Sequence, residues 1–482
     1  MSLRDKYEVV IGLEVHAQLL TKTKAYSSDE NIYGAIPNTK TSVISLGHPG
    51  TLPRTNSKVI EYAVKLGIAV GSDIREHNEY ARKNYFYADL PKGYQITQDT
   101  TPICNGGTIQ IKDKEGNAKH IAITRIHMEE DAGKSIHDLD PFNTLVDLNR
   151  AGVPLVEVVS EPDIRSSEEA YQYITEVRKL VRYLDICDGN MEEGSLRCDA
   201  NVSVMLKGAT EFGTKVEVKN MNSSRNVVRA IEFEIDRQIE LLETGGEISH
   251  ETRSFNAANN STISMRHKEE ANDYRYFPEP DLQPVIVTKE YIAKVKASLP
   301  PLPTELFKKF SIEFGLSEYD ANILIDEKGI ALYFDTLCQH TKNYKSAANF
   351  VNGSVKSYLN ENAVTISNFS ISPQQLASLI TIVDDGKVSN TVATSKIFPA
   401  MINSDKTAEE IATENNWVQE SDSDALGDYI KQAIAKYPDK VAEYKEGKKG
   451  LIGLFMGEVM KLSKGQADPK LANQLLRTEL EK

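Results

Sequence analysis

Hydrophobic and polar positions alternate in several short runs of the first part of the chain. In the run 9–18, apolar residues from Leu13 onward alternate with Glu14, His16 and Gln18. A period of two is typical of a strand with one wet face. Four further runs suggest strands, the second of them preceded by a proline: 121–127, 155–159, 200–206 and 216–219.

Two segments between these runs have helical spacing instead. Ser166, with Glu169 three residues on, fits a capping box, and apolar residues then recur up to Leu184. A second helix is expected over about 225–242, before a Gly-Gly pair at 245–246. Because strands outnumber helices and many are close in sequence, we expect an α+β fold with a largely antiparallel sheet.

A proline-rich linker, Leu299-Pro300-Pro301-Leu302-Pro303, divides the chain, because it suits neither a helix interior nor a central strand. Helical stretches are expected beyond it, near 304–315, 318–343, 346–362, 373–384 and 389–401. Shorter helices with glycine breaks follow. We therefore predict three domains: 1–295 with the sheet, 296–405 helical, and 406–482 a small helical tail.

Bulk composition excludes several classes of protein. The 482 residues carry a net charge of −14, which argues against coating nucleic acid by bulk electrostatics. The four cysteines form no Cys-x-x-Cys pair. No apolar run approaches a membrane span, and the first residues lack a signal segment. We expect a cytoplasmic protein with no membrane partner.

The run His127-Met128-Glu129-Glu130-Asp131-Ala132-Gly133-Lys134-Ser135 concentrates acids beside a lysine. Alone it is more often a solvated turn. Other acids change that balance: Glu14 and His16 share one strand face, Glu157 interrupts an apolar run, and Arg197 and Asp199 precede a strand. Carboxylates from separate strands suit Mg²⁺ with phosphate oxygens, although each segment alone also fits a wet surface.

The residues that could bind phosphate or nucleic acid are cationic. Arg82-Lys83-Asn84-Tyr85-Phe86-Tyr87, followed by Lys92, mixes bases with aromatics, as does the segment 273–281. The triplet 133–135 is not a P-loop, because Met128 stands where glycine is required. From 447 to 478, five lysines and one arginine face only Glu458 and Asp468, a net of +4. That tail suggests an anionic partner, or else a mildly basic surface.

Taken together, these motifs resemble the B subunits of bacterial aspartyl/glutamyl-tRNA(Asn/Gln) amidotransferases, from one end of the chain to the other. The carrying segments are 12–16, 82–87, 127–135, 160–163, 191–201, 273–281 and 464–467. The resemblance implies a cradle domain similar to the glutamine synthetase and guanido kinase fold, then helical domains that bind tRNA. It implies a carbon-nitrogen ligase that uses ATP and Mg²⁺.

The implied reaction phosphorylates the side chain of Glu-tRNA(Gln) or Asp-tRNA(Asn). Ammonia from a glutaminase subunit then displaces the phosphate, and a small third subunit completes a heterotrimer. Which charged tRNA is used stays open.

The resemblance also implies roles for particular residues. Magnesium is assigned to His16, Glu130 and Glu157, with Glu14 and Glu129 in or next to its shell. Glu130 is preferred because Glu129 points the other way if the strand stays regular. The expected catalytic groups are Glu130, Lys83, Asp199 and Arg197, and Lys83 and Lys92 are expected to line the phosphate site or the ammonia path. Apart from the resemblance, we expect Lys134, with Ser135 beside it, to contact phosphate. The residues expected to bind tRNA are Lys448, Lys449, Lys461 and Lys464.

One departure from the family pattern is informative. Many relatives carry cysteine pairs where this chain has Ser27, Asp29, Ser42 and Ser45. Serine is a poor zinc ligand compared with thiolate. We therefore expect no structural zinc and a loop held by hydrogen bonds.

Two other functions remain as alternatives. The chain could be a tRNA-binding scaffold whose acids are structural. A stand-alone ATP-dependent ligase is less favoured, since no nucleophile or ammonia-generating site is evident. The scaffold and catalytic hypotheses differ in whether the acids and His16 meet at one point.

Overall fold

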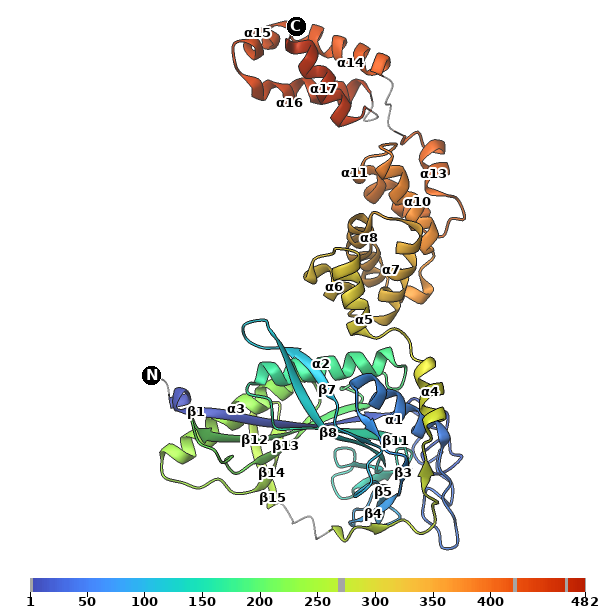
Figure 1. Ribbon diagram of the computed structural model, residues 1–482, viewed down its shortest axis with the longest axis vertical. Coiled ribbons are helices and arrows are strands. Elements are labelled where there is room, and N and C mark those ends of the chain that lie inside the picture. Colours follow the sequence, from blue (N-terminus) through green and yellow to red (C-terminus); the bar gives the residue numbers. More distant parts are fainter. Residues whose placement is uncertain (1–2, 268–273, 419–422, 464–466, 482) are drawn as a thin grey trace. The chain divides into compact units, whose positions relative to one another are not determined.

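The computed structural model describes residues 3–267, 274–418, 423–463 and 467–481 (Figure 1). The chain divides into two compact units, residues 1–302 and 303–482. The first contains the sheets and the second is built of helices. Each unit is described by itself.

The strands of the first unit form one large sheet and three small ones. Their bounds are β1 (Tyr7–Gln18), β2 (Asp73–Ile74), β3 (His77–Asn78), β4 (Ala81–Asn84), β5 (Tyr94–Thr97), β6 (Cys104–Asn105), β7 (Thr108–Lys112), β8 (Ala118–Glu130), β9 (Lys134–Ile136), β10 (Leu145–Asp147), β11 (Pro154–Ser160), β12 (Leu196–Leu206), β13 (Val216–Met221), β14 (Glu251–Asn256), β15 (Ser261–His267), β16 (Phe277–Pro278) and β17 (Val285–Ile286). The large sheet has ten strands among the described residues, in the order β15-β14-β13-β12-β1-β11-β8-β6-β2 with β7 beside β8.

The large sheet is antiparallel except where β13 and β14 pair in parallel. All five predicted strand runs lie inside observed strands, and a largely antiparallel sheet in a mixed α/β unit is confirmed. The small sheets are β16-β4-β5, β9-β10 and β3-β17.

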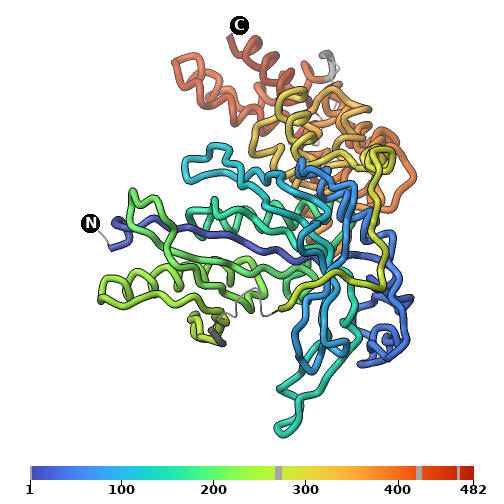
Figure 2. Tube along the Cα trace, turned by 60° about the horizontal axis from the view of Figure 1, so that its bottom comes forward, coloured from blue at the N-terminus to red at the C-terminus, as the bar shows by residue number. Residues whose placement is uncertain are grey.

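Strand β1 runs through the middle of the large sheet (Figure 2). Its side chains point alternately to the two faces of the sheet. The side chains of Leu13, Val15 and Ala17 are fully buried in the hydrophobic core. Successive side chains on a strand point to opposite faces, so Glu14 and His16 lie on the other side. The pattern that predicted the strand therefore also separates its core face from its polar face.

Helices α1 (Ser57–Val70), α2 (Ser167–Tyr183) and α3 (Ser224–Glu243) cover the core face (Figure 1), and α4 (Lys289–Ala297) packs against α1. Helix α2 begins as predicted, with the Ser166 hydroxyl accepting from the Glu169 N–H at 3.2 Å. The expected return bond differs: the Glu169 carboxylate accepts from the Arg165 N–H at 2.8 Å, one residue ahead of the cap. Both bonds satisfy donors near the start of the helix.

Two β-bulges change which side chains face the site. On β8, Arg125 pairs with Val159 but Ile123 pairs with Ser160, so Thr124 is an extra residue. On β13 the register shifts between Val218 and Met221, where Asn220 has a φ of 67°. An extra residue reverses the alternation beyond it. Along β8 the buried apolar residues are consequently Ile121 and Ile123 before the bulge, and Ile126 and Met128 after it.

The second unit consists of helices in its described part. They are α5 (Pro303–Lys308), α6 (Glu318–Leu324), α7 (Lys328–His340), α8 (Tyr344–Phe350), α9 (Lys356–Glu361), α10 (Pro373–Asp384), α11 (Asn390–Val392), α12 (Phe398–Met401), α13 (Ala408–Glu414), α14 (Ser423–Lys436), α15 (Pro438–Lys445), α16 (Ile452–Leu462) and α17 (Pro469–Glu481), with π-helical turns at Lys309–Glu313, Val351–Val355 and Ala393–Ile397. Among the described residues, no helix is long and apolar enough to cross a bilayer.

The predicted helical stretch 318–343 is wrong in one respect. The chain leaves the helix after Leu324 and enters α7 at Lys328. Leu324 and Ile325 are both buried at this turn, so tertiary packing ends α6 where the sequence alone shows no glycine or proline. The residues of α14, α16 and α17 share a separate hydrophobic core.

A buried carboxylate on α3 yields a stability prediction. Glu234 is fully buried and accepts hydrogen bonds from Arg237, Gln238 and Thr262. Removing one partner of a buried ion pair leaves uncompensated charge. We expect Glu234→Ala to lower the free energy of unfolding by about 3–5 kcal/mol. Glu240→Ala, on the exposed side of the same helix, is the control and should change it by less than about 0.5 kcal/mol in urea denaturation.

Candidate metal and phosphoryl-transfer site

A row of polar side chains crosses four strands on the face opposite the helices. His16 on β1 lies opposite Arg197 on β12 and Glu157 on β11, and Glu157 lies opposite His127 on β8. Directly opposite residues on neighbouring strands point to the same side. Glu14 and Asp199 form the next row, one step of two residues along the strands.

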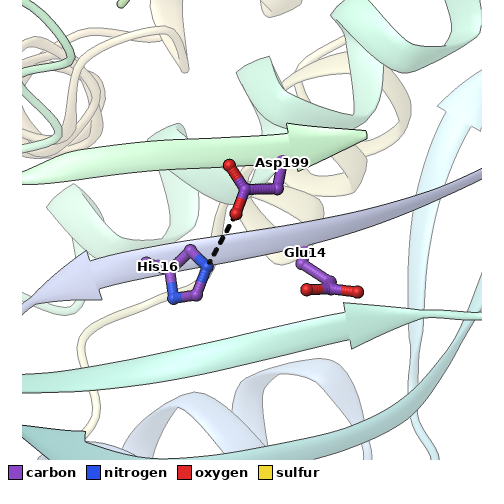
Figure 3. A group of neighbouring side chains, drawn as sticks. All are labelled: Glu14, His16 and Asp199. Atoms are coloured by element: carbon purple, nitrogen blue, oxygen red, sulfur yellow. Dashed lines mark ion pairs between the residues drawn. The ribbon is translucent and has the colours of Figure 1, made fainter. Parts of the chain in front are cut away.

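His16 joins two groups of acids. Within each group, one ligand atom from every residue lies within 4.8 Å of the others: Glu14, His16 and Asp199 form one group, and His16, Glu129 and Glu157 form the second. The His16 Nδ1 atom lies 3.6 Å from Glu157 Oε2, and Nε2 lies 3.7 Å from Asp199 Oδ2. Figure 3 shows the first group, with Asp199 reaching His16 from the neighbouring strand.

His16 cannot bind a metal ion in both groups at once. A neutral imidazole has one lone pair and one N–H. If one ring nitrogen binds a metal, the other donates its hydrogen, and a carboxylate is the usual acceptor. The arrangement therefore fits one metal-binding group and one orienting carboxylate.

Lysine and arginine side chains compensate the buried acids. Lys83 Nζ, which comes from β4 in a separate sheet, lies 3.9 Å from Glu129 Oε1. Arg197 donates to Asp131 at 2.9 Å, and Lys219 donates to Asp199 at 2.6 Å. Of these contacts the one to Glu129 is the longest, so the negative charge of Glu129 is the least compensated.

The titration of the site follows from this crowding. Burial opposes a charge on His16, but Glu157 and Asp199 outweigh it and raise the pKa of His16 to about 9. Burial likewise opposes charge on Glu157, yet His127 and His16 hold its pKa well below the usual range. For Glu129 burial prevails over Lys83 and raises the pKa. Burial opposes the charge of Lys83, but Glu129 raises its pKa.

Glu130 lies on the other side of β8 and does not meet His16 or Glu157. Its carboxylate accepts from the Lys92 ammonium and from the Ile96 N–H at 2.9 Å. Lys92 also lies over the rings of Tyr26 and Tyr94. The expected grouping assumed a regular strand, and the bulge at Thr124 gives the opposite result, in which Glu129 faces the site.

Lys92 and Glu130 instead line a small cavity of about 70 Å³, together with Tyr26 and Ser45. The resemblance implied that Lys83 and Lys92 both line the phosphate site or the ammonia path. They lie on different sides of β8. Lys83 is the one near the acids of the metal groups.

The remaining expected residues lie apart from the acids. Lys134 and Ser135 belong to the β9–β10 hairpin, where Lys134 is exposed and the Ser135 hydroxyl donates to Asp89 at 2.9 Å. In the tail, Lys448, Lys449 and Lys461 are exposed, and Lys448 pairs with Glu443 at 3.0 Å. Lys464 lies outside the described residues, as does part of the segment 273–281.

Three residues of the site were not nominated from the sequence. His127 Nε2 lies 3.4 Å from Glu157, Asp131 pairs with Arg197, and Lys219 holds Asp199. His127 is two positions from Glu129 on a predicted strand, a signal that was available. No sequence signal pointed to Lys219, because it reaches Asp199 across the bulged pair of strands β12 and β13.

The four positions that the resemblance aligns with family cysteines lie together. Asp29 Oδ2 accepts from the Ser45 hydroxyl and from the Ser42 N–H at 2.8 Å, and Ser27 and Ser45 hydroxyls lie 3.1 Å apart. A hydrogen-bonded loop therefore stands in this place. Its zinc content stays a prediction.

Family models match most of the chain. One described as the GatB/GatE catalytic domain covers residues 9–293, and one described as the GatB domain covers 332–480. The B subunit of the aspartyl/glutamyl-tRNA(Asn/Gln) amidotransferase from Caldicellulosiruptor saccharolyticus is 48% identical over 480 residues, which is 99% of this chain and 100% of the relative. The chain belongs to this family of amidotransferase B subunits.

Similarity within the family extends across several bacteria. The corresponding protein of Bdellovibrio bacteriovorus is 49% identical over 475 residues, 98% of this chain and 99% of the relative. That of Thermodesulfovibrio yellowstonii is 47% identical over 471 residues, 98% of each. The matched catalytic-domain region contains both groups of acids, His16 and the Asp29 loop.

The Asp29 loop gives a prediction on pH and metal content. Burial opposes the Asp29 charge, but hydrogen bonds from Ser45 and Ser42 lower its pKa. A lowered folded pKa contributes stability above the unfolded value of about 3.9, and that contribution disappears as the pH falls through the folded pKa. We expect Asp29→Asn to lower the free energy of unfolding at pH 7, with the difference shrinking in acid, measured by urea denaturation across pH.

Metal analysis of chelator-washed protein should find no stoichiometric zinc. Stoichiometric zinc, or an Asp29→Asn difference that does not change between pH 7 and pH 3, would contradict the hydrogen-bonded loop. Asp113→Asn is the comparison variant: this half-buried carboxylate, in the turn between β7 and β8, also accepts backbone N–H bonds that lower its pKa, so it should show the same pH trend outside the loop.

Proposed function

We propose that this chain is the kinase and transamidase subunit of a tRNA-dependent amidotransferase. It would convert Glu-tRNA(Gln), Asp-tRNA(Asn) or both to the amide, through an acyl phosphate made with ATP. Ammonia would come from a glutaminase subunit, within a heterotrimer completed by a small third subunit. The large sheet would then be the cradle of a glutamine synthetase-like catalytic domain.

The observation that carries this proposal is the convergence of acids from separate strands on His16. A scaffold has no need to place Glu129 and Glu157 together in a buried position with one lysine 3.9 Å away. Burying like charges side by side is costly unless a cation joins them. Carboxylate oxygens with one imidazole are a suitable donor set for a divalent cation that also binds phosphate.

We assign the magnesium to the group of Glu129, Glu157 and His16 Nδ1. Asp199 is already paired with Lys219, so it suits the acceptor of the His16 Nε2–H. Glu129 thus takes the role that the resemblance implied for Glu130. Bound there, the ion would offset the charge that develops on the transferring phosphoryl group.

The chain's own cations would position the anionic reactants. Lys83, with its raised pKa, stays charged and would bind phosphate oxygens beside Glu129. Arg197, at the β12 end of the polar row, donates to Asp131 and would keep that carboxylate from competing for the metal. Burial of these groups excludes water, which protects an acyl phosphate from hydrolysis.

Lys92 and Glu130 would serve a different step. Their cavity lies across β8 from the acids. We propose it as part of the ammonia path, where a charged pair can hold a polar molecule by hydrogen bonds. Lys134 and Ser135 are proposed to contact phosphate. Lys448, Lys449, Lys461 and Lys464 are proposed to bind tRNA phosphates.

The role of Glu129 can be tested in the reconstituted complex. We expect Glu129→Gln to reduce tRNA-dependent ATP hydrolysis at least about 100-fold, because a metal ligand is lost, while tRNA affinity is kept. Binding of Mn²⁺, followed by electron paramagnetic resonance, should weaken in parallel. Glu130→Gln is the neighbouring control and should keep wild-type Mn²⁺ affinity. Unchanged hydrolysis by Glu129→Gln would favour the scaffold function.

The tail can be tested separately by truncation after residue 418. This cut keeps α13, which packs against α10, and removes the separate core of α14, α16 and α17. We expect weaker tRNA binding and a shallower dependence of affinity on salt, by about one unit of slope for each lysine–phosphate pair that the truncation removes. Lys449→Gln with Lys461→Gln is the charge-only variant. An unchanged affinity and slope would show that the tail does not bind tRNA.

A further inference from the structure

Two arginines and a glutamine converge on one buried carboxylate beside the polar row. Asp131, the residue that follows β8, is 5% exposed. Its Oδ2 atom accepts from the Gln18 amide at 2.7 Å and from Arg197 Nη2 at 2.9 Å. Arg150 Nε lies 3.9 Å from the same oxygen. Two guanidinium groups thus share one negative charge in this cluster, which we call the Asp131 cluster.

Both arginines are fixed on one side and accessible on the other. Arg150 Nε donates to the Ala132 carbonyl at 2.9 Å, and Nη2 donates to the Gly133 carbonyl at 2.6 Å. Arg197 Nη2 donates to Asp131, whereas its Nε atom is buried without a hydrogen-bond partner among the described residues. The side chains of Arg150 and Arg197 are 36% and 34% exposed, so a ligand can reach both.

The Asp131 cluster lies next to the proposed metal-binding group. Arg197 on β12 lies directly opposite His16 on β1, and opposite residues on neighbouring strands point to the same side. Gln18 follows His16 by two positions and Asp131 follows Glu129 by two positions, so both side chains reach the same polar face, where they bond to each other. An anion bound by the arginines would therefore lie beside the metal-bound phosphate.

The positive charge of the cluster is not matched by the neighbouring acids. Asp199 is paired with Lys219, and Glu129 with Lys83. An arginine presents several N–H donors in a planar fork that suits the oxygens of a carboxylate or a phosphate. In the proposed reaction the metal ion and Lys83 already bind phosphate oxygens. The anion that still lacks a binding group is the carboxylate that is to be phosphorylated.

We propose that Arg150 and Arg197 bind the side-chain carboxylate of the aspartyl or glutamyl group carried by the tRNA. This inference rests on the proposed function, which requires that carboxylate beside the metal but assigns no residue to it. One carboxylate oxygen accepts hydrogen bonds from the arginines. The other forms a bond to the γ-phosphorus of ATP, while the bond from that phosphorus to ADP breaks.

The same donors serve the second step of the reaction. The oxygen that the arginines hold becomes the carbonyl oxygen of the acyl phosphate. When ammonia adds to the carbonyl carbon, this oxygen takes the negative charge, which the arginines stabilise. The carbonyl re-forms as phosphate leaves with the proton that the nitrogen loses. Asp131 stays bonded to the arginines throughout and is a positioning residue.

The test compares tRNAs that differ only in this carboxylate. Binding to the assembled complex without ATP is measured by fluorescence anisotropy for tRNA charged with the acid, tRNA charged with the corresponding amide, and uncharged tRNA. ADP affinity is measured by calorimetry. Arg150→Gln and Arg197→Gln are the site variants. Arg178→Gln is the matched control, because this exposed arginine on α2 also donates to a backbone carbonyl, that of Gly189 at 2.7 Å.

We expect the wild type and Arg178→Gln to bind the acid-charged tRNA at least about 10-fold more tightly than the amide-charged tRNA, because hydrogen bonds between charged groups are lost with the carboxylate. Each site variant should lose this preference and keep its affinity for uncharged tRNA and ADP within about twofold. Arg197→Gln keeps the test valid if Arg150→Gln does not fold.

Phosphates of the tRNA or of the nucleotide are the other anions that could bind two arginines. An equal loss for all three tRNAs would assign the arginines to the tRNA backbone, and a loss of ADP affinity would assign them to the nucleotide. Either result, or a wild type that binds acid-charged and amide-charged tRNA equally, would overturn the carboxylate site. A wild-type complex without tRNA-dependent ATP hydrolysis would instead defeat the proposed function itself.

Discussion

The polar face of the sheet depends on the compensation of buried negative charge. Glu129, Asp131 and Glu157 are buried, and Asp199 is nearly so. A carboxylate removed from water is costly by several kcal/mol unless a cation or hydrogen bonds replace its hydration. Asp131 has Arg197, Asp199 has Lys219, and Glu157 has two histidines. Among the described residues, the cation paired with Glu129 is Lys83 at 3.9 Å, and this incomplete compensation is what a divalent cation would meet.

Much of the fold and some of this site could be predicted from the sequence. Period-two patterns located β1, β8, β12 and β13, and a short apolar run located β11. The same parity correctly put Glu14 and His16 on one face. The division into three domains remains a prediction, since the compact units divide only near residue 302.

The choice between Glu129 and Glu130 could not be made from alternation alone. The buried apolar residues of β8 have odd numbers up to Ile123 and even numbers from Ile126 onward. This change in the alternation marks the bulge in the sequence. A bulge is stabilised by the partner strand, so its position depends on pairing that local patterns do not reveal. The Lys219–Asp199 contact was missed for the same reason.

Glu129 and Glu130 thus place their side chains on opposite sides of β8. Glu130 is held with Lys92 near the loop that carries Asp29, and the Cβ position of Gly152 lies 3.7 Å from both Glu130 Oε2 and Ser45 Oγ. Gly152 has a φ of 85°, so a side chain is disfavoured there on conformational grounds as well. The loop that carries Asp29 and Ser45 is therefore close to the Lys92–Glu130 pair, with Gly152 between them.

The bulge at Thr124 also determines which changes of length this protein tolerates. Loss of the extra residue at Thr124 would leave Ile123 and Ile126 two positions apart, so β8 would alternate regularly and His127 and Glu129 would stay on the polar face. Loss of one residue between the bulge and Glu129 would instead turn Glu129 into the apolar core beneath the helices. A single-residue deletion should consequently be accepted at the bulge and purged in evolution between the bulge and Glu129, where a substitution alters only one side chain.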